Sequence, residues 1–250
     1  MTSAPCVVDA SSVAPDRAED GTAETRTTLD PSTGCPNLTQ RVARFAPGRS
    51  RPRGAPGRED VGFVVAGRGT LLIDGVAHAL EPGTAFHVAE GERYEVDNPG
   101  PDDLVWVEAL VPLPADTRPG PDPGPLGPRA VTVRLDDQPV HRTGDRTFRV
   151  LVAPGTGCRG VTQFVGDIPP GRAPAHTHPY DEVVYIVSGE GVVHLGDGER
   201  AVATGSCVYL PPGTPHCIEN RGPGPLRLLG VFHPAGSPAA KSTLVNGSQR

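Results

Sequence analysis

Short β-branched or alternating hydrophobic runs dominate the second half of the chain. Examples are FRVLVA (148–153), EVVYIVS (182–188) and LRLLGVF (226–232), and turn segments such as PG, GEG, GDG and PPGTP separate runs of this kind. No window keeps an apolar period of 3.6 residues over ten residues, so amphipathic helices are not indicated. Closely spaced strands with glycine and proline turns are typical of a β-sandwich or barrel. The pattern therefore predicts an all-β protein.

The chain also contains an internal repeat. Residues 29–49 align with 152–172 at a shift of 123, and after the loss of one residue the alignment resumes at a shift of 122. Identical pairs include Gly34/Gly157, Cys35/Cys158, Gln40/Gln163, Gly83/Gly205 and Asn98/Asn220. A period this long indicates duplication of a whole domain, because solenoid repeats are only about 20–50 residues long.

A segment rich in proline and glycine separates the two copies. Residues 111–128 hold seven Pro and three Gly, which predicts an extended, stiff connector. We expect a disordered segment over 1–20, a first domain over 21–111, a linker over 112–129, a second domain over 130–235 and a flexible tail over 236–250. The run AVTVRL (130–135) alternates like a strand and can pair with either copy.

Composition narrows the classes of partner. The 250 residues carry a net charge of −6 and are 36% hydrophobic, which suits a globular domain and disfavours nucleic acid or an anionic membrane as a partner. We see neither an apolar run of about 20 residues nor a secretory signal, so we expect a cytoplasmic protein. Five cysteines without a CxxC spacing favour reduced thiols over a disulfide framework.

The segment HTHPYDE (176–182) carries the most informative chemistry. Alternate side chains of a strand share a face, so His176 and His178 project to one side, and the following turn returns Glu182 to that side. A third imidazole, His216, comes 34 residues after Glu182. Two imidazoles and a carboxylate form the facial set that a divalent transition metal recruits, with open positions left for substrate or oxygen.

These motifs resemble those of the cupins, and the duplication resembles a bicupin. The first motif is His176, His178, Glu182 and Gly189, and the second is Gly205, Pro211, Gly213, His216 and Asn220. One departure is that four residues separate Gly171 from His176, where the family usually has five. The resemblance implies two jelly-roll-like, double-stranded β-helix barrels, with one metal ion at His176, His178, Glu182 and His216.

The first copy lacks the ligand set. Asp60 aligns with Glu182 and Tyr94 with His216, while the two histidines face either Gly54 and Pro56 or Arg53 and Ala55, depending on where the deletion falls. We therefore predict that the first copy keeps its fold without a metal. Its expected role is packing, dimerisation or shaping access to the second copy.

The predicted cofactor is one divalent transition metal ion: Fe, Mn, Ni or Zn. We expect a small-molecule substrate and a homodimer. The leading hypothesis is a dioxygenase-like oxidoreductase acting on a small enolisable or hydroxy-carbonyl compound, with Glu182 as ligand or general base and Tyr180 and Tyr209 as further catalytic candidates.

Two alternatives stay open. One is a redox-neutral isomerase, lyase or hydrolase that uses the metal as Lewis acid and needs a separate acid or base, for which Tyr180, Tyr209 and His233 are candidates. The other is a module that binds a sugar or another small molecule without turnover.

Overall fold

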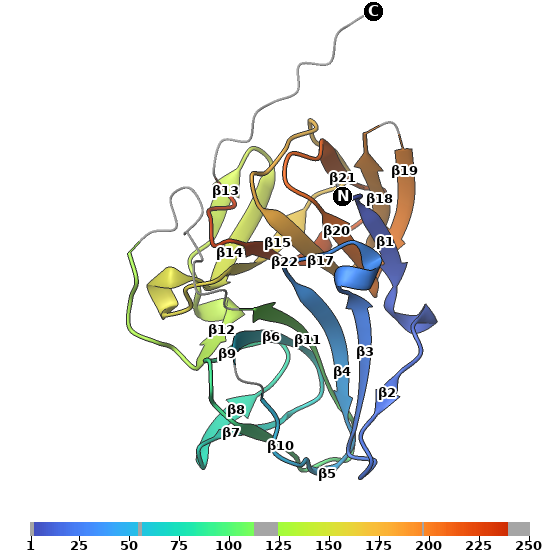
Figure 1. The fold of residues 1–250 in the computed structure, drawn as a ribbon. Coiled ribbons are helices and arrows are strands. Elements are labelled where there is room, and N and C mark those ends of the chain that lie inside the picture. The colour runs from blue at the N-terminus through green and yellow to red at the C-terminus, as the bar shows by residue number, and fades with distance from the viewer. Residues whose placement is uncertain (1–2, 55–56, 113–124, 197, 240–250) are drawn as a thin grey trace, which may run out of the picture.

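The computed structural model describes residues 3–54, 57–112, 125–196 and 198–239, and these form two β-barrels (Figure 1). Each barrel pairs a seven-stranded sheet with a four-stranded sheet. Within the described residues no α-helix occurs, and the short 3-10 turns are η1 (Ala10–Ser12), η2 (Pro31–Thr33), η3 (Leu135–Asp137) and η4 (Pro154–Thr156). The prediction of two cupin-like barrels is confirmed.

The N-terminal barrel consists of two antiparallel sheets. In spatial order the larger sheet contains β12 (Thr132–Arg134), β9 (Thr84–Val88), β6 (Arg58–Ala66), β11 (Leu104–Pro112), β4 (Thr39–Phe45), β3 (Ala23–Leu29) and β2 (Asp16–Arg17). The smaller sheet contains β5 (Gly48–Arg49), β10 (Tyr94–Asn98), β7 (Gly69–Ile73) and β8 (Val76–Leu80).

The C-terminal barrel repeats this plan. Its larger sheet contains β1 (Cys6–Asp9), β20 (Ser206–Leu210), β17 (Asp181–Ser188), β22 (Leu226–His233), β15 (Thr162–Ile168), β14 (Arg146–Val152) and β13 (His141–Thr143). Its smaller sheet contains β16 (Gly171–Arg172), β21 (His216–Asn220), β18 (Glu190–Leu195) and β19 (Gly198–Ala203).

The two halves exchange one strand each. Strand β1, from the start of the chain, pairs with β20 of the C-terminal barrel, while β12, which follows the connector, pairs with β9 of the N-terminal barrel. In Figure 1 the blue strand β1 accordingly lies beside the orange strands of the second barrel. The sequence pattern did not reveal this exchange, because a short alternating strand fits the free edge of either barrel.

This exchange corrects two expectations. Residues 3–20 are not a disordered segment, since they contain β1, η1 and β2, and β1 is hydrogen-bonded along β20. The run at 130–135, placed in the second domain by the sequence analysis, contributes β12 to the first barrel. Most of the predicted linker (113–124) and of the predicted tail (240–250) lies outside the described residues, and the remaining boundaries stay predictions.

The sequence repeat corresponds to repeated turns. Asn98 and Asn220 are both buried, and each ties a loop together through three hydrogen bonds: Asn220 Nδ2 donates to the carbonyls of Ile168 and Gly224, and its Oδ1 accepts from the Gly222 N–H. Asn98 makes the corresponding three bonds in the N-terminal barrel. The persistence of this asparagine is therefore explained by loop structure in both barrels.

Alternation along the central strands divides the buried residues into three groups. One group fills the N-terminal barrel around Trp106, and a second fills the C-terminal barrel around Phe232. A third draws residues from both halves, including Val61, Phe63 and Val183, and forms a shared core between the barrels. On β17, Glu182 and Val184 consequently face the barrel interior, while Asp181, Val183 and Tyr185 face the other barrel. No helix in the described parts of the chain is long and apolar enough to span a membrane.

Candidate metal centre

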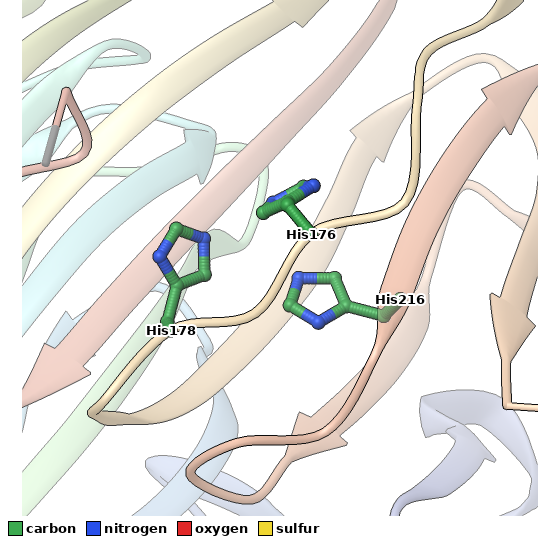
Figure 2. Close-up of side chains that lie close together, drawn as sticks. All are labelled: His176, His178 and His216. Atoms are coloured by element: carbon green, nitrogen blue, oxygen red, sulfur yellow. The ribbon is translucent and has the colours of Figure 1, made fainter. Parts of the chain in front are cut away.

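Three imidazole rings lie close together in the C-terminal barrel, as Figure 2 shows. His176 and His178 come from the extended segment before β17, and His216 begins β21. A β-bridge joins His176 to His216, with reciprocal backbone hydrogen bonds of 2.9 Å. The ring centroids are 4.5 Å apart for His176 and His216 and 4.8 Å apart for His176 and His178.

Glu182 supplies the carboxylate. Its Oε2 atom lies 3.6 Å from Nε2 of His216 and 3.9 Å from Nε2 of His178. These separations are too long for hydrogen bonds. Two donors that are each about 2.1 Å from one ion lie at most about 4.2 Å apart, so the spacing suits a shared cation.

The protonation states of these residues also suit a metal. Burial lowers the pKa of His178 to about 3 and that of His216 to about 4, with nearby imidazoles adding to both effects. The rings are therefore neutral at pH 7 and offer lone pairs. Nδ1 of His216 donates to the Thr214 carbonyl at 2.9 Å, which leaves its Nε2 free to bind.

Glu182 shows the opposite effect. Burial raises the pKa of its carboxyl group to about 8, against a smaller lowering by the positive charge of Arg146. Its Oε2 atom is buried and has no hydrogen-bond partner within the described structure, and the same is true of His178 Nδ1. A buried carboxylate oxygen without a partner is costly. A divalent cation would satisfy it, so the residues present fit the metal that the sequence predicts.

A cavity of about 300 Å³ opens onto this cluster. The four predicted ligands line it together with apolar side chains and the charged side chain of Arg146; the apolar residues include Phe148, Phe164, Ile168, Leu210, Ile218, Leu228 and Phe232. The volume is at the lower end of the range for small-molecule sites. The arrangement therefore provides room for a small ligand beside the four donors.

The N-terminal barrel has a different set of residues at the equivalent place. A β-bridge joins Arg53 to Tyr94, as one joins His176 to His216, so Arg53 is the structural counterpart of His176. Asp60, the counterpart of Glu182, is held by Arg58 at 2.9 Å. An arginine-paired acid and a buried tyrosine replace the donors, which agrees with the prediction that this copy lacks the metal ligands.

Tyr209 requires a correction. Glu182 pairs with Leu210 in the sheet, so the neighbouring Tyr209 lies opposite Val183, on the face turned toward the other barrel. Its hydroxyl donates to Asp181 Oδ1 at 2.5 Å, and it does not line the cavity. The prediction that Tyr209 is a catalytic residue of this site is therefore wrong, because the strand register turns its side chain away from the cavity.

Tyr180 lies behind the histidines. Its ring is fully buried, with a centroid 6.1 Å from that of His178 and 4.9 Å from that of Phe232. It does not line the cavity, whereas its ring neighbours His178 and Phe232 both do. His233, the other acid or base candidate, pairs with Asp181 in the sheet and is also absent from the cavity wall.

A second cluster with metal-ligand atoms lies between the barrels. Glu59 accepts hydrogen bonds from the Cys158 thiol at 3.5 Å and the Gly160 N–H at 3.3 Å, and His87 lies 3.2 Å from its other oxygen. The repeat places Glu59 opposite Asp181, and Asp181 is likewise held, by Tyr209 and Asn37. Glu59 and Asp181 are therefore both buried acids that accept hydrogen bonds from the other half of the chain, and in this way they join the barrels.

Arg146 is the site residue that the sequence analysis missed. It begins β14, 30 residues before His176, and lies within no recognised motif. The signal that could have found it is its alternation with Phe148 and Val150, which places all three on the inner face of one strand.

The chain belongs to the cupin family. The family model described as "Cupin domain" matches residues 41–110 and 164–232, one region in each barrel. The repeated match and the two barrels together define a bicupin.

Among curated proteins, the chain is 36% identical over 80 residues to the uncharacterized protein MJ1618 of Methanocaldococcus jannaschii. The matched region covers 30% of this chain and 64% of that protein. It is 30% identical over 100 residues to the tetracenomycin polyketide synthase protein TcmJ of Streptomyces glaucescens. This matched region covers 38% of this chain and 66% of TcmJ. The chain thus spans slightly less than two thirds of either relative.

Solved structures extend the fold likeness to the whole chain. A putative glyoxylate-induced protein from Pseudomonas aeruginosa superposes with a TM-score of 0.77 at 20% identity, covering 97% of this chain and 89% of that one. Protein YlbA from E. coli gives 0.76 at 13% identity, covering 95% and 93%. An oxalate decarboxylase structure from Bacillus subtilis gives 0.74 at 15% identity, covering 96% and 79%. At these identities the likeness concerns the fold alone.

Proposed function

We propose that the C-terminal barrel holds one divalent transition metal ion at His176, His178, Glu182 and His216, and that the protein is a dioxygenase-like enzyme for a small enolisable or hydroxy-carbonyl compound. The observation that carries this proposal is that all four residues line one cavity of about 300 Å³, where ligand atoms of the three histidines lie within 4.8 Å of one another and Glu182 Oε2 lies 3.6 Å from His216 Nε2. A bound ion of this kind supplies Lewis-acid polarisation of a substrate oxygen and, when it is redox-active, electron transfer to dioxygen.

The protein's own groups have separate tasks in this proposal. The three neutral imidazoles and Glu182 fix the position at which a substrate oxygen docks. The Glu182 carboxylate, which is ionised when it holds a cation, is the group placed to take up the proton that an enolisable substrate releases. The phenylalanine and leucine side chains of the cavity wall exclude bulk water from that position.

The positions of Tyr209, Tyr180 and His233 favour this function over the redox-neutral alternative. An isomerase, lyase or hydrolase needs an acid or base besides the metal ligands. None of these three candidates lines the cavity, where the acids besides Glu182 are Asp145 and Asp167. The relative TcmJ is by name a polyketide synthase protein, and polyketides are rich in enolisable carbonyl groups, which agrees with the substrate class proposed here.

Metal analysis followed by oxygen-electrode assays tests this function. We expect about one Fe, Mn, Ni or Zn per chain after purification without added metal, and oxygen uptake when the iron, nickel or manganese form meets a suitable enol. Turnover that proceeds equally fast under anaerobic conditions would show that the enzyme is redox-neutral.

A matched pair of histidine variants controls for folding. His176→Ala is expected to lose most of the bound metal and the oxygen uptake. His194→Ala is the control, because His194 is a buried histidine of the same barrel whose ring nitrogens lie 2.8 Å from Glu219 and 3.0 Å from Glu199, away from the cavity. Equal metal content in the two variants would contradict the ligand assignment.

A further inference from the structure

We infer that Arg146 is the anion-binding residue of the cavity and binds a carboxylate group of the substrate. The substrate is then a small organic acid. That this ligand is a substrate rests on the proposed function. Arg146 begins β14 and alternates with Phe148 and Val150 on the inner face of the barrel. It lines the same cavity as the four predicted ligands.

The hydrogen bonding of this side chain is incomplete. Nη2 donates to the carbonyl of Ile218 at 2.7 Å, whereas the buried Nε has no acceptor. Within the part of the chain that the structure describes, no carboxylate forms an ion pair with it, and Asp145 and Glu182 act on it only at longer range. A half-buried guanidinium with one carbonyl partner has donors to spare, and a planar carboxylate is the group that such donors fit best.

Two further acids, Asp145 and Asp167, line the cavity wall besides Glu182. Asp167 is bound side-on by Arg227 at 2.7 and 3.1 Å, so its charge is balanced outside the ligand space. Asp145 acts on Arg146 electrostatically and forms no ion pair with it within the described residues, so the guanidinium keeps donors free, which favours an anionic ligand over a neutral sugar.

The N-terminal barrel provides an internal comparison. The repeat places Ala23 opposite Arg146, and the strand pairings agree, because Thr147 pairs with Asp167 as Glu24 pairs with Arg44. Ala23 is buried among the apolar residues of its barrel. At this strand position the C-terminal barrel therefore has a guanidinium where the N-terminal barrel has a methyl group, so the fold itself does not need the arginine there.

Binding of malonate, a small dicarboxylate probe, tests the inference without an activity assay. Calorimetric titrations are made on metal-free and zinc-loaded protein at pH 7 in low-chloride buffer. We expect Arg146→Met to weaken malonate binding about tenfold or more in both forms, since hydrogen bonds between charged groups are lost. Zinc content should stay as in the wild type, because Arg146 is not among the predicted ligands.

Arg149→Met is the matched control. Arg149 lies three residues further along the same strand, faces away from the cavity and also has a buried Nε without a partner. It should bind malonate as the wild type does. If Arg146→Met does not fold, Arg146→Lys replaces it, with malonate binding expected to weaken several-fold because an ammonium group cannot form the fork.

The outcomes separate the two proposals. Zinc uptake with malonate affinity unchanged in the Arg146 variants overturns the inference and leaves the metal site standing. Absence of zinc binding, with malonate binding that still depends on Arg146, overturns the proposed function and supports the anion site. Sulfate binding as tightly as malonate overturns the assignment to a carboxylate.

Discussion

Replacing Glu182 by glutamine should change stability in opposite directions with and without metal. Burial raises the pKa of Glu182 from its ordinary value of 4.5 to about 8, so the folded apo protein prefers the protonated form. A raised pKa in the folded state contributes stability that is fully present below pH 4.5 and is lost as the pH rises toward 8.

The size of the effect follows from the shift. One pKa unit corresponds to about 1.4 kcal/mol, so the loss of unfolding free energy is about 3 kcal/mol at pH 7 and about 5 kcal/mol above pH 8. Glutamine is neutral at every pH and avoids this loss. Metal-free Glu182→Gln should therefore match the wild type near pH 4 and exceed its stability by several kcal/mol at pH 8.

Urea denaturation followed by far-UV circular dichroism provides the measurement. It is made on chelator-treated protein at a series of pH values, and the difference between variant and wild type removes the contribution of the buried histidines. With zinc present the order should reverse, because the variant has lost an anionic ligand. A metal-free variant that is no more stable than the wild type at pH 8 would refute this reasoning.

Three further predictions concern the fold and the corrected residue. Asn220→Ala removes three hydrogen bonds and should lower the unfolding free energy by about 3 kcal/mol in chemical denaturation. Tyr209→Phe removes the bond to Asp181 and should cost about 1.5–3 kcal/mol while leaving metal content unchanged; loss of metal would restore Tyr209 to the site. Gly62→Ala places a methyl carbon 2.0 Å from the Phe86 ring, so a lowered melting temperature is expected, and an unchanged one would contradict the packing described here.

Much of the site is predictable from sequence because its information is local. His176, His178 and Glu182 lie within seven residues, and their strand geometry follows from side-chain alternation. His216 lies on a different strand, but the motif spacing identifies it. The strands were predictable from short alternating runs, and the duplication was predictable from identical residues 122 or 123 positions apart.

The remaining features depend on contacts between distant segments. Tyr209 was misplaced because the pairing of Glu182 with Leu210 decides which face of β20 meets the cavity. Arg146 was missed because its approach to the histidines depends on closure of the barrel. The exchange of β1 and β12 also lies beyond local patterns, because a four-residue and a three-residue strand hold too little information to choose a partner.

The reciprocal placement of β1 and β12 interlocks the halves of the molecule and limits how they can be separated. A C-terminal fragment that begins after the connector would contain β12 without its partner β9. It would also lack β1, so β20 would become an unpaired sheet edge, which promotes aggregation. A C-terminal barrel produced without the rest of the chain therefore needs residues 6–9 fused to it, so that β20 keeps its neighbouring strand.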